Sequence, residues 1–139
     1  MSDTTTPIVT GTDFITVPTK DIAASEAFYG GLLGLTFAKR WGKMPGAEYE
    51  TGNLTLALME PEAFGGEFRK SGTAVALRVD DVAARREELE AKGVTFLGDI
   101  IDSGVCHMAN FRDPDGNTLM LHNRYAPKDA HPGEQIPDA

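Results

Sequence analysis

Apolar and polar positions alternate along short stretches of this chain and follow a helical spacing in two places. The first apolar stretches of the two halves, residues 14–17 and 74–79, are rich in β-branched side chains, which is typical of strands. Asp21 and Asp81 follow them. An aspartate in front of an amphipathic segment predicts a helix N-cap, because its carboxylate accepts hydrogen bonds from free amides of the first turn. Each half should therefore begin with a strand and then a helix.

The two predicted helices differ in how much apolar surface they carry. The first has an apolar stripe, whereas the second has only Val82 and Leu89 among charged side chains and is expected to be largely solvated. Both helices should end at a glycine, because a left-handed residue commonly closes a helix. The stripe consists of Ile22, Phe28, Tyr29, Leu32 and Leu33, and the two glycines are Gly34 and Gly93.

The same order of elements recurs because the chain contains an internal repeat. Three short segments of the first half are matched in the second half, in the same order, 60, 59 and 64 residues later. Three collinear matches predict two tandem copies of one unit. The matched segments are residues 21–24 with 81–84, 34–37 with 93–96, and 52–53 with 116–117.

Three further strand candidates follow each helix, so each unit is predicted to be a βαβββ module. One helix covers only one face of such a sheet, and two modules can line a shared concavity with their uncovered faces. The predicted fold is α+β, with two tandem βαβββ modules forming a cup-shaped sheet. The strand candidates are residues 35–39, 47–51 and 53–59 in the first module and 94–97, 105–111 and 117–122 in the second.

The repeat also divides the chain into segments. The first module spans residues 11–61 and the second spans residues 72–124. Residues 1–10 form an N-terminal arm, and a glycine-containing, turn-like linker, residues 62–71, joins the modules. The C-terminal tail, residues 125–139, contains three prolines and is expected to be disordered or draped on the surface.

Length, charge and cysteine content exclude several classes of protein. The chain has 139 residues and a formal net charge of −8, which suits one globular core and disfavours nucleic acid as a partner. No apolar stretch approaches the roughly 20 residues of a membrane-spanning helix, and no secretory signal pattern is present. We therefore expect a cytoplasmic protein with no membrane partner. Cys106, the one cysteine, cannot by itself form an internal disulfide or a thiolate metal cluster.

The negative charge is distributed unevenly. Five glutamates and no lysine or arginine lie between Lys43 and Arg69. Such a run is typical of a solvated face that keeps a protein soluble. The alternative is a patch that attracts a cationic ligand.

Motifs in both halves resemble those of the vicinal oxygen chelate superfamily, which includes glyoxalase I, bleomycin resistance proteins, extradiol dioxygenases and fosfomycin resistance enzymes. The resemblance covers residues 11–124 and implies paired βαβββ modules around a cup. Relatives usually close such cups by pairing chains, so it also implies a homodimer. The motifs are Asp21-Ile22, Ser25, Phe28-Tyr29, Leu33-Gly34-Leu35, Val79-Asp80-Asp81-Val82 and Arg112-Asp113-Pro114-Asp115-Gly116-Asn117.

Enzymes of this superfamily hold a divalent metal at four points of the cup, one from the first and one from the last strand of each module. The resemblance carries the first-strand positions onto Phe14 and Ala74, and the last-strand positions onto Met120 and Leu56. Divalent ions of this kind need oxygen or imidazole ligands. All four positions are apolar, so no metal, cofactor or catalytic residue is expected.

Two histidines offer a relocated metal site as an alternative. His122 lies two residues after Met120 and so shares its strand face, and His107 could project inward if the strand register permits. Together with Glu60 or Glu50 they have the composition of a metal-binding triad. The competing interpretation is that both are hydrogen-bonded residues on the rim of the cup.

Trp41 and the apolar positions also allow two interpretations. Trp41 follows a strand candidate and is either a ligand-stacking lid or a half-buried loop anchor. Phe14, Leu56 and Met120 either line a binding cup or fill a collapsed core.

The leading interpretation is a metal-free binder of a small organic molecule, of the sequestration or resistance type. Apolar walls desolvate the ligand, aromatic rings contact it, and histidines orient it by hydrogen bonds. The alternatives are a metal-dependent lyase or dioxygenase with relocated ligands and a structural or regulatory dimer without a ligand site. The expected ligand-binding residues are Phe14, Trp41, Leu56, Ala74, His107, Met120 and His122.

Overall fold

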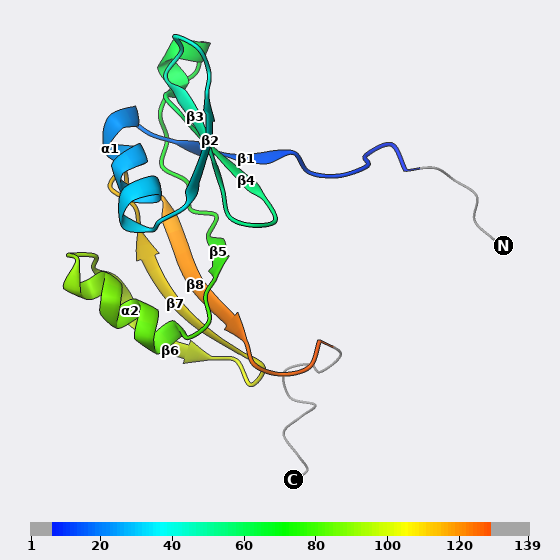
Figure 1. Cartoon of the computed structure of the whole chain (residues 1–139), viewed down its shortest axis with the longest axis vertical. Helices are drawn as coiled ribbons and strands as arrows, with labels where there is room; N and C mark the ends of the chain where they lie inside the picture. The colour runs from blue at the N-terminus through cyan, green and yellow to red at the C-terminus, as the bar shows by residue number, and fades with distance from the viewer. Residues whose placement is uncertain (1–6, 129–139) are drawn as a thin grey trace, which may run out of the picture.

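Each half of the chain folds as one strand, a helical segment and three further strands (Figure 1). The computed structural model describes residues 7–128. The first module contains β1 (Phe14–Pro18), α1 (Ile22–Glu26), η1 (Ala27–Leu32), β2 (Thr36–Arg40), β3 (Gly46–Glu50) and β4 (Thr55–Met59). The second contains β5 (Val75–Arg78), α2 (Val82–Ala91), β6 (Phe96–Asp102), β7 (Cys106–Arg112) and β8 (Thr118–Arg124).

The two sheets have the same topology. Their strand orders are β1-β4-β3-β2 and β5-β8-β7-β6. In each, the first strand of the module runs parallel to the last, and the remaining pairs are antiparallel. This confirms the predicted α+β fold with two tandem βαβββ modules.

Both helices begin directly after the aspartates that the sequence predicted as N-caps. The Asp21 carboxylate accepts a hydrogen bond from the Ala24 amide at 3.2 Å, and the Asp81 carboxylate accepts one from the Ala84 amide at 3.0 Å. Gly34 has a φ of 79°, which lies in the left-handed region that a glycine adopts without strain. The caps and the stop are therefore local consequences of the sequence.

The first helix changes its winding in a way that the apolar pattern does not indicate. After α1, residues 27–32 form the π-helical segment η1, which buries Phe28 and Tyr29. Gly30 lies directly against Tyr49 of β3, and a Cβ atom built there would lie 2.6 Å from the Tyr49 ring. Glycine thus permits this close approach of the helical segment to the sheet.

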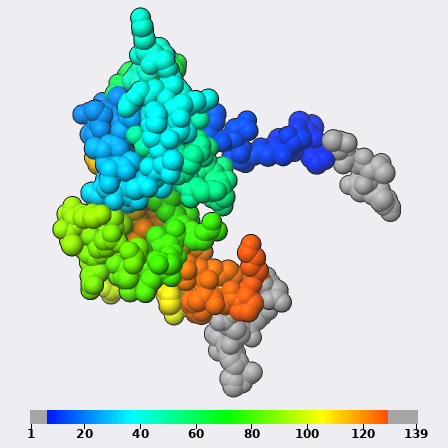
Figure 2. Space-filling model, viewed as in Figure 1, coloured from blue at the N-terminus to red at the C-terminus, as the bar shows by residue number. Residues whose placement is uncertain are grey.

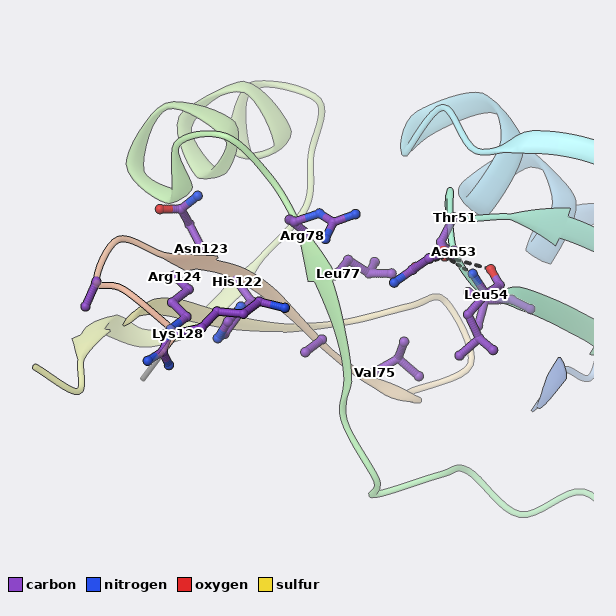
Figure 3. A pocket seen from close by; sticks show the side chains of 13 residues that line it. Thr51, Asn53, Leu54, Val75, Leu77, Arg78, His122, Asn123, Arg124 and Lys128 are labelled. Atoms are coloured by element: carbon purple, nitrogen blue, oxygen red, sulfur yellow. Dashed lines mark hydrogen bonds between the residues drawn. The ribbon is translucent and has the colours of Figure 1, made fainter. Parts of the chain in front are cut away.

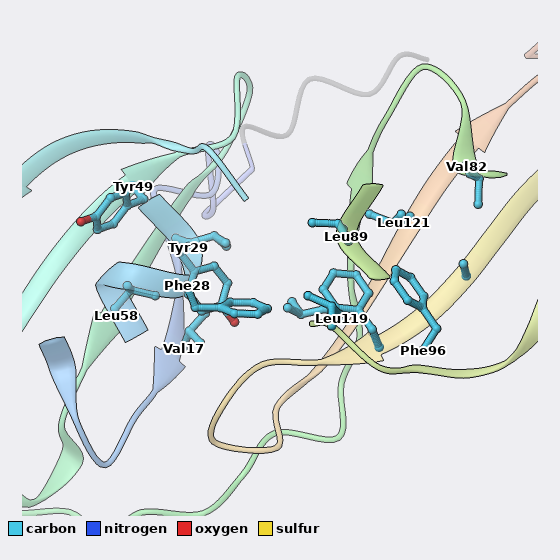
Figure 4. Packing of buried hydrophobic residues seen from close by; sticks show 14 of the residues in the cluster. Val17, Phe28, Tyr29, Tyr49, Leu58, Val82, Leu89, Phe96, Leu119 and Leu121 are labelled. Carbon is cyan, nitrogen blue, oxygen red and sulfur yellow. The ribbon is translucent and has the colours of Figure 1, made fainter. Parts of the chain in front are cut away.

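One hydrophobic core extends through both modules, between the sheets and their helices. Phe28 of η1 reaches across the boundary, and its ring centroid lies 6.4 Å from that of Phe111 on β7. Figure 4 shows Phe28 pointing from the first module toward Leu119 of the second. The two modules therefore share their buried surface.

Hydrogen bonds from the turn between β7 and β8 also join the modules. Asp113 accepts a bond from the Tyr29 hydroxyl at 2.7 Å, and Asp115 accepts one from the Thr19 hydroxyl at 2.6 Å. The Asn117 amide donates to the Pro18 carbonyl at 2.8 Å. The turn motif of the second module thus holds the end of β1 in the first.

The segment between the modules contains a short helix. The region predicted as a linker from residue 62 begins within a short 3-10 helix, η2 (Pro61–Phe64). The part of the arm that the structure describes, residues 7–10, is exposed and, with residues 11–13, extends away from the sheets (Figure 1). The predicted tail lies outside the described residues from position 129 onward. Within the described part of the chain, no helix is long and apolar enough to cross a membrane.

The space-filling view shows where the molecule is hollowed (Figure 2). The arm projects from the first module and the end of β8 from the second, and the surface between them is concave. The helices lie on the other side of the molecule (Figure 1). The concave side therefore belongs to sheet faces that the chain's own helices do not cover.

Candidate functional site

The free face of the second sheet follows from strand alternation. Leu119, Leu121 and Ala109 belong to the core under the helices, so the residues between them on β8 and β7 point to the opposite side. The register aligns two rows across that free face. They are Ala76, Met120, Asn110 and Leu97 in one row, and Arg78, His122, Met108 and Ile101 in the other.

The free face of the first sheet follows in the same way. Val17 and Leu58 are core residues, so Phe14 and Thr16 on β1 and Ala57 on β4 face away from the helices. Phe14 is 45% exposed, whereas Ala57 is fully buried among its neighbours.

Three of the four positions matched to metal ligands lie on or beside these free faces. Phe14 lies on β1 and Met120 on β8. Ala74 immediately precedes β5, two residues before Ala76, the strand partner of Met120. None of the three side chains has an oxygen or nitrogen that could bind a divalent ion, so the chemistry of this donor set does not fit a metal.

The register corrects the fourth position. Leu56 pairs with Ile15 and Tyr49 and belongs to the core on the helix side of the sheet. Ala57 pairs with Thr16 as Met120 pairs with Ala76, so Ala57 is the counterpart of Met120. The segment between β3 and β4 has four residues, 51–54, whereas the segment between β7 and β8 has five, 113–117, and this difference of one residue shifts the correspondence. Ala57 is also apolar, so the donor set remains unsuitable for a metal.

Trp41 lies over the free face of the first sheet and is held there by several contacts. Its indole N–H donates to Glu48 Oε2 at 2.8 Å, and its ring centroid lies 6.4 Å from that of Phe14 and 5.7 Å from that of Phe64. A Cβ atom built on Gly46 would lie 2.2 Å from the indole. Trp41 is therefore an anchored, half-buried ring beside Phe14.

The two histidines lie on opposite faces of the second sheet. His122 pairs with Met108 and His107 pairs with Asn123, so strand alternation directs the two imidazoles to different sides. His107 Nε2 lies 3.4 Å from Asp102 Oδ2, and its ring stacks 4.8 Å from Tyr125. These contacts agree with the interpretation of His107 as a residue on the rim of the cup, and not with one in which its side chain projects inward.

Asp102, the neighbour of His107, is held in its charged form. A backbone hydrogen bond from Gly104 lowers the pKa of the Asp102 carboxyl, and the Tyr125 hydroxyl, which donates to the same carboxylate at 2.8 Å, lowers it further. His107 adds a smaller effect of the same sign. Contacts among Asp102, His107 and Tyr125 therefore explain why these side chains lie together.

The glutamates of the relocated triad are also engaged elsewhere. Glu60 accepts a hydrogen bond from the Ile22 amide at 2.9 Å, at the start of α1, and Glu50 accepts one from the Thr55 hydroxyl at 2.8 Å. Within residues 7–128, no three His, Cys, Asp or Glu side chains come together as a metal site. The structure therefore does not assemble the predicted triad.

A cavity of about 560 Å³ lies between the turn that precedes β4 and the strands β5 and β8. Leu54, Val75 and Leu77 supply apolar wall, and Arg78 and His122 bring basic groups to it. Figure 3 shows the basic side chains on the β5 and β8 side, opposite Thr51, Asn53 and Leu54. A second cavity of about 250 Å³ lies between β1 and β5.

The predicted site residues divide between these cavities and other places. His122 and Leu56 line the larger cavity, and Ala74 lines the smaller one. Phe14, Trp41, Met120 and His107 line neither of them. The predicted residues thus lie on both faces of the sheets and do not form a single pocket within this chain.

Sequence reasoning missed Arg78, which lines the larger cavity from β5. A signal was present, because an arginine inside an otherwise apolar strand indicates a free face. Sequence reasoning also missed Arg124. This residue lies at the end of β8, two residues beyond His122 and on the same face.

Comparisons with known proteins agree with this architecture. A model of the Glyoxalase/Bleomycin resistance protein/Dioxygenase superfamily matches residues 11–121. The chain is 31% identical over 112 residues to the glutathione transferase FosA of Serratia marcescens, covering 78% of this chain and 77% of that protein.

Solved structures show the same fold. A glyoxalase/bleomycin resistance protein/dioxygenase from Nocardioides is 25% identical with a TM-score of 0.70, covering 94% of this chain and 92% of its own. TnmS3, an antibiotic binding protein from Streptomyces sp. CB03234, is 23% identical with a TM-score of 0.70, covering 86% of this chain and 99% of its own.

Proposed function

Because the chain belongs to the Glyoxalase/Bleomycin resistance protein/Dioxygenase superfamily, we propose that it is a metal-free member that binds a small organic molecule. The observation that carries the proposal is the donor set. Phe14, Ala57, Ala74 and Met120 occupy the four positions where metal-dependent relatives are expected to have ligands. Apolar side chains there favour burial of an apolar ligand surface over coordination of an ion.

The geometry supports binding without catalysis. A cavity of about 560 Å³ falls in the size range of small-molecule sites, and the two modules contribute to it from opposite sides. A ligand that fills it gains affinity from desolvation and needs no reacting group. TnmS3, which has the same fold, is an antibiotic binding protein, and sequestration of an organic compound is the activity that we propose for this chain.

The similarity to FosA favours a second candidate function, an enzyme of the same superfamily, of which the sequence analysis offered a metal-dependent lyase or dioxygenase. FosA is a transferase by name, and the 31% identity extends over most of both chains. That function would need ligands relocated to other residues, and the separation of His107 from His122 opposes the arrangement that the sequence offered.

A homodimer is part of the proposal. Both sheets leave one face free of the chain's own helices, and large apolar side chains such as Ile101 (47% exposed) and Phe14 (45% exposed) lie on those faces. A second copy placed on the concave side would cover them and close the cup.

Thermal melts with added metal test the absence of a metal site. Zn²⁺, Ni²⁺, Mn²⁺ and Fe²⁺ are each added to the chelator-treated protein, and no specific rise in melting temperature is expected, because only preferential binding to the native state stabilises it. Elemental analysis of protein purified with and without oxygen accompanies the melts. Stoichiometric metal, or a rise abolished by the double change His107→Ala and His122→Ala, would establish the enzyme alternative instead.

A further inference from the structure

We infer that the ligand of the 560 Å³ cavity is an organic anion, with an apolar body and a carboxylate or similar acidic head group. The inference rests on the proposed binding function and specifies the ligand of the same site. Its basis is the contrast between the charge of the whole protein and the charge of the cavity.

The chain carries a formal net charge of −8, but the cavity wall is basic. Arg78, His122, Arg124 and Lys128 line it, and among residues 7–128 no aspartate or glutamate belongs to its wall. An acidic protein repels anions over most of its surface, so a basic concavity is the place where an anion is attracted.

Arg78 is available to a ligand. Its side chain lies on the free face of β5, next to His122 on β8, and within residues 7–128 it makes no ion pair or side-chain hydrogen bond. Asp80, the acidic residue nearest to it in sequence, pairs instead with Arg85 at 3.2 Å. A guanidinium in this position can bind a carboxylate through two parallel hydrogen bonds.

Arg124 lies on the same face as His122 and is positioned by the backbone. Its Nη2 donates to the Pro127 carbonyl at 2.6 Å, which fixes the guanidinium beside the cavity. Lys128, which also lines the cavity, adds a third permanent positive charge. The basic groups come from β5, from β8 and from the segment after β8, and so they surround one end of the cavity.

Apolar side chains make up a further part of the wall and determine the body of the ligand. Leu54, Val75 and Leu77 lie on it, and burial of a hydrocarbon body against them contributes most of the binding free energy. The acidic head group then selects the ligand by its charge. A cationic ligand of the same shape would be repelled by Arg78 and Arg124.

The experiment uses three probes with the same aromatic body, 2-naphthoate, 2-naphthylmethanol and 2-naphthylmethylammonium. Dissociation constants are measured by calorimetry on the full-length protein at low and at high salt. Naphthoate should bind about tenfold more tightly than the alcohol, since a charged hydrogen bond contributes on the order of 1.5 kcal/mol. The ammonium probe should bind most weakly. Added salt should weaken only the preference for the anion.

The variant Arg78→Gln locates the effect, and Arg69→Gln is its matched control. Both remove one positive charge, but Arg69 lies outside the cavity, paired with Glu67 at 3.1 Å. Arg78→Gln should reduce naphthoate affinity about tenfold and leave the alcohol unchanged, whereas Arg69→Gln should change neither. Circular dichroism confirms that each variant is folded.

The possible failures are distinguishable. If the alcohol binds as tightly as naphthoate, or if both variants weaken naphthoate equally, the anion inference is wrong and the proposed binding function stands. If none of the three probes binds at millimolar concentration, the proposed apolar binding site itself is contradicted.

Discussion

At the scale of single residues, apolar side chains occupy the strand positions that the resemblance matches to metal ligands. Met120 shows the consequence, because it is half-buried on the free face of β8 and its neighbour Leu121 is buried on the other face. The same strand therefore contributes to the core with one side and to the concave surface with the other.

Substitution of Met120 separates a binding surface from a collapsed core. Met120→Glu should fold, because its carboxylate can reach solvent on the free face, and it should weaken binding of apolar aromatic probes that extend beyond the cavity onto this face, because that carboxylate must be desolvated. The matched variant Leu121→Glu should not fold, since it buries an unpaired charge. Circular dichroism and probe titration test both. An unfolded Met120→Glu protein would support a collapsed core, and unchanged affinity would remove Met120 from the site.

The raised pKa of Tyr49 predicts that the folded protein loses stability at alkaline pH. Burial, together with its 2.8 Å hydrogen bond to Glu26, raises the pKa of Tyr49 from 10.0 to about 12. The folded protein therefore retains this proton after the unfolded chain has lost it. The resulting stabilisation is complete below pH 10 and is lost as the pH rises toward 12.

Urea unfolding at pH 8, 10 and 11 checks this prediction. Tyr49→Phe should be less stable than the wild type by about 1 kcal/mol at pH 8, because the hydrogen bond to Glu26 is removed. The difference should shrink between pH 10 and pH 11. A constant difference across the three pH values would show that Tyr49 does not titrate in this window.

At the scale of elements, the π-helical segment η1 determines how the first helix meets its sheet. Its winding places Phe28 and Tyr29 in the core, where Tyr29 reaches Asp113 of the second module. Desolvation by burial is the largest cause that raises the pKa of the Tyr29 hydroxyl, and the neighbouring Asp113 raises it further. This one turn thus serves packing within the module and attachment between modules.

Two adjacent glycines in η1 provide a matched pair of substitutions. Gly30→Ala should destabilise the protein by about 1–3 kcal/mol, because overpacking forces a shift where the new Cβ would lie 2.6 Å from the Tyr49 ring. A Cβ atom built on Gly31 would have no atom within 4 Å, so Gly31→Ala should stabilise the helical segment by up to about 1 kcal/mol. Thermal or urea unfolding measures both. Equal effects would mean that the contact with Tyr49 does not limit the helix position.

At the scale of the whole molecule, the two modules behave as one body with one free side. Tyr29, Thr19 and Asn117 contribute hydrogen bonds between them, and the shared core adds apolar contact. The free side carries large exposed apolar residues on both sheets, which is the usual composition of a surface that another molecule covers.

Sedimentation at micromolar concentration tests the proposed homodimer. We expect a species of about twice the 14.9 kDa chain mass, because a C2 pairing buries both free faces at once. Ile101→Glu places a charge on an exposed position of the free face and should shift the equilibrium toward the monomer. Glu87→Gln, on the exposed side of α2, is the control and should leave it unchanged. A single species at the chain mass for the wild type contradicts the proposal.

The fold was predictable from the sequence because its determinants are local. Alternation, helix spacing, the caps Asp21 and Asp81 and the stop at Gly34 act within a few residues, and the internal repeat extends them to both modules. The apolar character of Phe14, Ala74 and Met120 was likewise visible in the sequence.

Tertiary structure alone decided which faces these residues share. The turns before β4 and β8 differ by one residue in length, so the residue equivalent to Met120 is Ala57 and not Leu56. A shift of one residue matters because successive side chains in a strand point to opposite faces. The same alternation, together with the strand register, places His107 and His122 on opposite faces and Arg78 beside His122. Strand pairing between residues more than 40 positions apart sets that register, and no local pattern encodes it. The sequence therefore determined the two modules and the apolar character of these positions, and the pairing of strands determined which residues line the basic cavity.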